Sequence, residues 1–159
     1  MSKARPDALA EWRAVVPLVH GMVDGRSEIE IDRRPDAESM TLRETVHHVV
    51  EANVVAASIV TAALGRPGSV YDWSWMLPFG KWMEQMRYDR KPLAPSLRLL
   101  EALNEYVAAQ IEPLEDGLER RVRLRDQPDG PLREVTVADI LIQEAEHARE
   151  HVEEAMGRK

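Results

Sequence analysis

The stretch TLRETVHHVVEANVVAASIVTAALG, residues 41–65, decides the fold because it encodes one long and almost entirely apolar helix. Thr41 and Glu44 form a capping-box pattern, in which Thr41 caps the helix while Glu44 reaches back to the free backbone amide. Val46 to Leu64 is apolar nearly all round, and Gly65 closes the run. A helix of this kind is typical of the middle of a helical bundle.

We expect this helix to lie in a protein core and not in a membrane, because His47, His48, Glu51 and Asn53 interrupt it. The N-terminal sequence MSKARPDALAEW lacks the apolar run of a signal peptide. The chain has no cysteine, which excludes disulfides, thiolate metal sites and a cysteine nucleophile, and fits a reducing compartment. The sequence therefore predicts a cytoplasmic protein without a membrane partner.

The length and charge of the chain narrow its functional classes. Its 159 residues are the size of one domain, so we expect a single domain over residues 1–159. The formal net charge of −7 argues against a nucleic-acid partner, because neutralising phosphates requires clustered Lys and Arg. Arginines do gather between Arg120 and Arg125, but acidic residues lie just upstream, so we expect a solvated turn or strand edge there.

Three further segments show apolar residues at helical spacing. The first opens at Pro6, and Pro17 inside its apolar stripe predicts a kink or a break. Another begins near Pro95 and ends at Pro113. Thr136 is positioned to cap the last helix. Four helices of this kind predict an all-α, four-helix bundle.

The connections between these helices are unequal in length. Residues 66–92 form a long crossover between the second and third helices, with a short helix predicted around Lys81 to Tyr88. A connection of this length usually has a function or covers the core. Residues 121–136 predict a small hairpin or an extended loop before the fourth helix. The aromatic residues of the crossover either line a substrate pocket or pack as a lid; they are Tyr71, Trp73, Trp75, Phe79 and Trp82.

The stretch EHAREH, residues 146–151, places two histidines on one face of the last helix. His147 and His151 are four positions apart, so their side chains differ by only about 40° around the helix axis. Two imidazoles at this spacing can hold one metal ion. The alternative is that both histidines are ordinary surface residues.

The same stretch also matches the H-x-x-E-H pattern of a class of zinc proteases, in which Glu150 would be the general base. We reject this interpretation. Those enzymes take a further acidic ligand from well downstream, whereas this sequence ends at Lys159. Glu150 also turns away from the apolar side of its helix. A third metal ligand is therefore expected upstream.

His48 is the upstream candidate because it aligns with the apolar face of the second helix. It shares that face with Ala52, Val55 and Ile59, so its imidazole is expected to point into the bundle. An unpaired buried imidazole nitrogen is costly, so His48 requires a partner. Either a metal ion shared with the two late histidines or a hydrogen bond to Glu144 would provide one.

The other two histidines of the helices are weaker candidates for metal ligands. His47 shares a polar strip with Glu44 and Glu51, so we expect it to be solvated or to lie behind the ligands. His20 stands alone near the end of the first helix and is expected to be structural or exposed.

Two motifs in this order resemble the DinB-like (DinB/YfiT) superfamily of bacterial metal-binding four-helix bundles. The first is Thr41-Leu-Arg-Glu44-Thr-Val-His47-His48, which is similar to the family's cap, glutamate and histidine in the second helix. The other is Thr136-Val-Ala-Asp139-Ile-Leu, which leads to His147-Ala-Arg-Glu-His151 in the last helix. The resemblance covers nearly the whole chain.

The resemblance implies an up-down-down-up bundle that holds zinc or nickel through His48, His147 and His151, together with water. In the family the ligand lies four residues after the glutamate, which favours His48 over His47. Understood members include thiol-dependent transferases and isomerases that use bacillithiol, mycothiol or glutathione. Many other members have no known activity, and homodimers are common in the family.

We therefore expect a metal-dependent enzyme with an open coordination position, either a transferase that activates a low-molecular-weight thiol or a hydrolase of small molecules. The open position would bind water or thiol and lower its pKa towards neutrality. Glu144, one turn before His147, is either a general base or partner of the site or a plain surface carboxylate. The alternative is a non-catalytic, metal-binding or dimerising bundle protein with a role in stress response.

Overall fold

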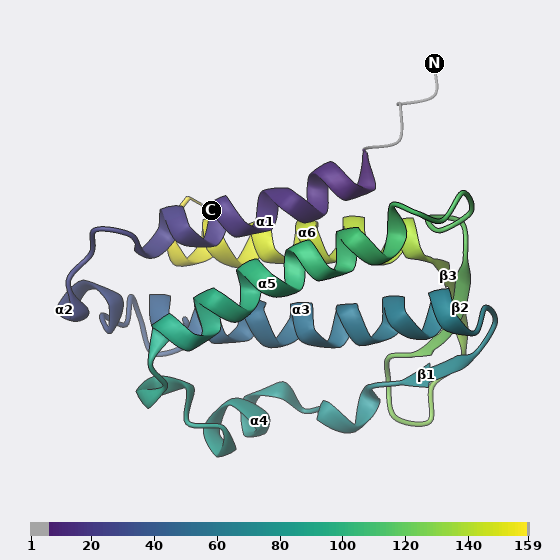
Figure 1. Cartoon of the computed structure of the whole chain (residues 1–159). Coiled ribbons are helices and arrows are strands. Elements are labelled where there is room, and N and C mark those ends of the chain that lie inside the picture. Colours follow the sequence, from purple (N-terminus) through teal and green to yellow (C-terminus); the bar gives the residue numbers. More distant parts are fainter. Residues whose placement is uncertain (1–6, 159) are drawn as a thin grey trace.

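The computed structural model describes residues 7–158, which form a four-helix bundle (Figure 1). Its long helices are α1 (Ala8–Val23), α3 (Leu42–Gly65), α5 (Leu93–Ile111) and α6 (Val137–Ala155). Helices α1 and α6 run in one direction, and α3 and α5 run in the other (Figure 1). This is the up-down-down-up topology that the resemblance to the DinB-like superfamily implies.

Helix α3 is the central element of the bundle, as its apolar sequence predicts. It packs along both α5 and α6, while α1 lies mainly against α6. Val46, Val49, Val60 and Ala63 are fully buried along its length. By length and composition α3 could also cross a membrane, but the core helix of a bundle meets the same criteria.

Two capping boxes fix where α3 and α6 begin. The backbone amide of Glu44 donates to Thr41 Oγ1 over 3.1 Å, and the amide of Thr41 donates to Glu44 Oε2 over 2.9 Å. Thr136 and Asp139 make the same reciprocal pair at the start of α6. Each box satisfies two amides that a helix start leaves free, so it also fixes which face later residues occupy.

The start of α1 and its course past Pro17 differ from the prediction. Pro6 lies outside the described residues, and the Asp7 carboxylate caps the helix by accepting from two backbone amides. The prediction of a break at Pro17 was wrong, because α1 continues without interruption to Val23. Pro17 removes one backbone hydrogen bond, but its neighbours Val15 and Val19 are fully buried and hold the segment in place.

The start of α5 is earlier than predicted, and one short helix was not predicted at all. Helix α5 begins at Leu93 instead of Pro95, because proline is tolerated in the first turn, where its missing amide has no intrahelical partner. The unpredicted helix is α2 (Glu28–Ile31), which is a single turn capped by Ser27. Four residues are too few to show helical periodicity.

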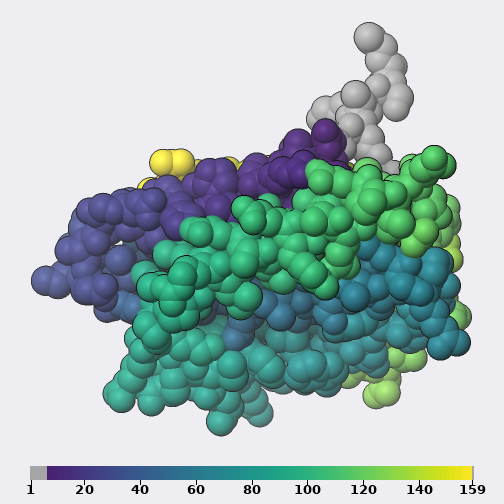
Figure 2. Space-filling model, viewed as in Figure 1, coloured from purple at the N-terminus to yellow at the C-terminus, as the bar shows by residue number. Residues whose placement is uncertain are grey.

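The crossover carries the chain back from the end of α3 to the end where α5 begins (Figure 1). It contains β1 (Val70–Asp72), the 3₁₀ turn η1 (Ser74–Met76), α4 (Phe79–Gln85) and the 3₁₀ turn η2 (Tyr88–Arg90). The short helix was predicted about two residues too late. In the space-filling view the crossover lies against the bundle below α5, alongside α3 (Figure 2).

A small sheet closes the bundle at the end of α3. Strands β2 (Arg121–Arg125) and β3 (Arg133–Thr136) form the predicted hairpin, with Val122 opposite Val135. Strand β1 joins β2 in parallel, which was not predicted because it is only three residues long. Val122 and Val135 are buried against the bundle, while most of the arginines of β2 face outwards. The sheet therefore anchors the start of the crossover.

Candidate metal centre

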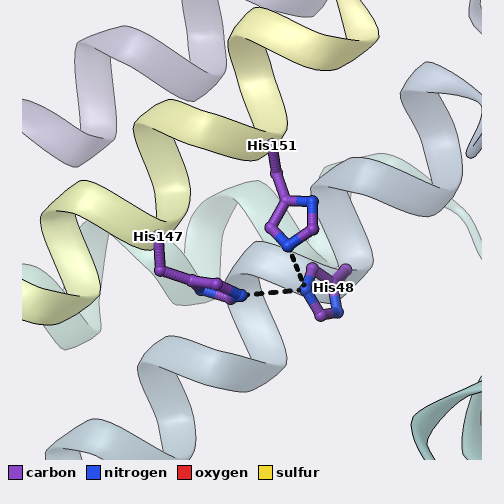
Figure 3. A group of neighbouring side chains, drawn as sticks. All are labelled: His48, His147 and His151. Atoms are coloured by element: carbon purple, nitrogen blue, oxygen red, sulfur yellow. Dashed lines mark hydrogen bonds between the residues drawn. The ribbon is translucent and has the colours of Figure 1, made fainter.

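Three histidines converge between α3 and α6 (Figure 3). His48 Nε2 lies 3.1 Å from His147 Nε2 and 3.0 Å from His151 Nε2. The antiparallel packing of α3 on α6 places the first turns of α3 beside the last turns of α6 (Figure 1). Residues about one hundred positions apart in the sequence therefore form one cluster, as the sequence predicts.

The geometry of the three nitrogens fits a metal ion better than it fits hydrogen bonding. A tetrahedral ion with bonds of about 2.0–2.1 Å holds its ligand nitrogens about 3.3 Å apart, close to the distances here. His48 Nε2 carries either one proton or one lone pair, so it cannot make two well-directed hydrogen bonds. His48 Nδ1 is buried and has no hydrogen-bond partner among the described residues. The polar contacts of this ring are therefore those of Nε2 with the other two histidines.

The surroundings keep His48 neutral. Burial, together with the nearby His151 and His147, lowers the pKa of His48 to about 3. A neutral imidazole is the form that binds a metal ion. Burial alone would also lower the pKa of His147, but the hydrogen bond and charge of Glu144 raise it overall. The proton of His147 therefore competes with a metal ion in weak acid.

Glu144 lies where a carboxylate can orient His147. Its Oε1 atom is 3.3 Å from His147 Nδ1, and only 14% of its side chain is exposed. A carboxylate on the outer nitrogen of a ligand histidine fixes the tautomer that presents Nε2 to the metal. The alternative of a plain surface carboxylate is therefore wrong, whereas a general-base role stays a prediction.

Asn53 is a supporting residue that the sequence reasoning missed. Its side-chain amide is fully buried and donates to Glu144 Oε1 over 3.0 Å and to Val49 O over 3.0 Å. Both N–H groups are thus used, and the carboxylate is held against His147. The sequence did carry a signal for this role. Asn53 is a polar residue on the side of α3 that faces away from the polar strip of Glu44, His47 and Glu51, where the other residues are apolar.

His47 is buried, which corrects the expectation of a solvated residue. Its Nδ1 lies 3.0 Å from Ser96 Oγ and its Nε2 lies 3.1 Å from Lys91 O. Burial is the main cause of its lowered pKa. The crossover and the start of α5 cover the polar strip of α3, so His47 connects helices and does not reach the cluster. His20 is structural as expected, paired with Asp24 and Glu101.

A cavity of about 600 Å³ opens beside the three histidines. Phe79 of the crossover covers His48 edge-on, with ring centroids 4.5 Å apart.

The three tryptophans of the crossover have different surroundings. Trp73 lines the cavity, which agrees with the prediction that crossover aromatics line a pocket. Trp75 is largely exposed, and Trp82 packs on it and donates to Glu51. Glu150 is exposed, as expected from its helical position.

Comparison with known proteins agrees with this fold. The family model of the DinB superfamily matches residues 8–155. The structure of YfiT from Bacillus subtilis, described as a probable metal-dependent hydrolase with an unusual four-helix bundle topology, superposes with a TM-score of 0.78. It is 17% identical and covers 99% of this chain and 86% of its own, so it supports the fold. No curated protein matches the sequence. The family match spans nearly the whole bundle, and the chain therefore belongs to the DinB superfamily.

Proposed function

We propose that this protein is a metal-dependent enzyme whose divalent ion is held by His48, His147 and His151. The observation that carries the proposal is that three Nε2 atoms converge at the wall of an apolar cavity. Three histidines and one open position are typical of a catalytic site, whereas structural zinc sites are closed by a fourth protein ligand. Among the described residues the cluster consists of these three histidines alone.

Imidazole ligands suit both zinc and nickel, so either ion is a candidate. A divalent ion at such a site acts as a Lewis acid and lowers the pKa of a bound water or thiol towards 7. Glu144 holds His147 in the required tautomer and also lines the cavity, so it is the candidate general base. Phe79 packs edge-on against His48, and Met83 lines the same cavity.

Two reactions use this arrangement, and they differ in the nucleophile. Hydrolysis uses water, and it is supported by the likeness in fold to YfiT, described as a probable metal-dependent hydrolase. Transfer to a low-molecular-weight thiol is supported by the cavity volume of about 600 Å³, which leaves room for a thiol beside an electrophile. The competing class is a non-catalytic bundle protein whose metal is structural.

The experiment that separates these possibilities loads the protein with zinc or nickel and assays two panels. Esters and amides are offered without thiol, and electrophiles are offered with glutathione, bacillithiol or mycothiol. Turnover in one panel is expected for the wild type and for His20→Ala, and it is expected to disappear in His147→Ala. If the loaded protein turns over neither panel, the enzymatic proposal is wrong.

The predicted homodimer and the cytoplasmic location stay predictions. The exposed Leu99 and Tyr106 on α5 leave an apolar outer face available for a second copy. Gel filtration with light scattering would measure the mass directly.

A further inference from the structure

We propose that the cavity is a channel for a straight alkyl or acyl chain, whose polar, reacting end lies at the three histidines. The position of the reacting end rests on the proposed function, whereas the binding of the chain does not. Four features of the described residues support it: the lining, the length, the floor of small side chains and a polar chamber at one end.

The lining separates polar from apolar groups along the channel. The three histidines lie at one end, Gln143 and Glu144 follow about one turn along α6, and apolar side chains from α3, α6, β2 and the crossover surround the rest. The single charged group towards the sheet end is Arg133, which is paired with Asp126. A ligand that fits this lining is polar at one end and apolar along its length. The apolar residues that line the channel are Val55, Ile59, Trp73, Met76, Leu124 and Ile140.

The two bundle helices give the same length for the channel. On α3 the lining residues run from His48 to Ile59, and on α6 they run from Ile140 to His151. The ends of each span are eleven positions apart, which corresponds to about 16 Å at 1.5 Å per residue. Because α3 and α6 are antiparallel, both spans begin at the histidines and end near the sheet (Figure 1). The space is therefore long as well as apolar.

Small side chains form the middle of the channel floor, so the backbone of α3 lies close to the cavity there. Ala52 and Ala56 lie one and two turns after His48 on the same face of α3. Leu77 and Phe79 of the crossover line the same cavity. An alanine floor between larger apolar side chains leaves room for an extended chain that lies along α3.

A second cavity of about 580 Å³ adjoins the histidine end. Met40 and Met83 line both cavities, so two flexible methionine side chains separate them. The second cavity is lined largely by charged side chains, which include Arg34, Arg87 and Glu38. A polar head group that passes the histidines would enter this polar chamber while the chain stays in the apolar channel.

The first experiment uses metal-free protein and measures the binding of butanol, octanol and dodecanol by calorimetry. Each methylene that is buried is expected to tighten binding about fourfold, since it contributes about 0.8 kcal/mol. Ala56→Phe places a ring about 12 Å from His48, so it is expected to weaken dodecanol binding at least tenfold and to leave octanol binding unchanged. Val54→Phe, on the exposed side of α3, is the matched control. Ile59→Phe replaces Ala56→Phe if circular dichroism shows that the latter is unfolded.

The second experiment uses zinc-loaded protein with butyl, octyl and dodecyl hydroxamates, whose head groups bind metal ions. Tighter binding than that of the alcohols at every chain length would place the polar end at the histidines. Chain-length dependence without this gain would support the channel and contradict the proposed metal function. Equal affinity for short and long alcohols, or equal effects of Ala56→Phe and Val54→Phe, would overturn the channel proposal and leave the metal proposal intact.

Discussion

The Glu51 carboxylate is predicted to be the main attachment of the crossover to α3. Its Oε2 atom accepts from Trp82 Nε1 over 2.8 Å and from the Tyr88 hydroxyl, and its Oε1 atom accepts from Lys91 Nζ over 2.9 Å. The side chain of Tyr88 is 1% exposed. Burial would raise the pKa of Glu51, but these three donors lower it overall. Burial and the same contact also raise the pKa of Tyr88.

The loss of stability on removing Glu51 can be worked out from the three hydrogen bonds that its carboxylate accepts. A hydrogen bond to a charged group contributes about 1.5–3 kcal/mol, and a buried hydroxyl left without a partner costs about 1–3 kcal/mol. Lys91 is more than a quarter exposed, so its ion pair adds only about 0–1 kcal/mol. We expect Glu51→Ala to lower the free energy of unfolding by about 3–5 kcal/mol. Glu51→Gln keeps an acceptor for Tyr88, so its cost is about 1–2 kcal/mol.

Urea denaturation of four proteins measures the coupling energy between Glu51 and Tyr88. The wild type, Glu51→Ala, Tyr88→Phe and the double variant form a cycle with an expected coupling energy of about 1–2 kcal/mol, because Glu51→Ala and Tyr88→Phe each remove the contact. Glu105→Gln, on the exposed side of α5, is the matched control and should change stability by less than about 0.5 kcal/mol. Faster tryptic cleavage between Lys81 and Lys91 would show that the crossover has loosened. A coupling energy near zero would refute this attachment.

Three further predictions concern the histidine cluster, the cap of α3 and the pH dependence of the Glu51 contact. Glu144→Gln should weaken metal affinity about 10–100-fold by calorimetry, because His147 loses its anionic partner; unchanged affinity would remove Glu144 from the site. Thr41→Ala should cost about 1 kcal/mol in urea, with Thr61→Ala as the exposed comparison. Because the folded pKa of Glu51 lies below its usual 4.5, its contribution is present above that pH and is lost as the pH falls through the lower folded value. Glu51→Gln should therefore lose less stability than the wild type on acidification; parallel stability curves would contradict this.

The helical bundle and the cluster were predictable because both depend on local, periodic signals. Capping boxes at Thr41 and Thr136 fix the start of two helices, and from those starts the spacing decides which side chains point inwards. His48, His147 and His151 were therefore identified without knowledge of tertiary contacts. The resemblance to the superfamily supplied the antiparallel arrangement that brings them together.

The parts that could not be predicted depend on what the crossover covers. His47 has the sequence context of a surface residue, yet residues more than forty positions away bury it. The three-residue strand β1 gains its partner from β2, and no local pattern encodes that pairing. The role of Asn53 required knowing which face of α3 meets α6, because its partner Glu144 lies 91 positions further along the chain.

The central claim is that the three histidines bind one metal ion, and elemental analysis of the purified protein tests it most directly. The wild type is expected to retain roughly one equivalent of zinc or nickel after dialysis, since three imidazoles hold the ion. His48→Ala, His147→Ala and His151→Ala should each lose most of it, while His20→Ala, outside the cluster, should retain it. Metal content in His48→Ala equal to that of the wild type would contradict the account.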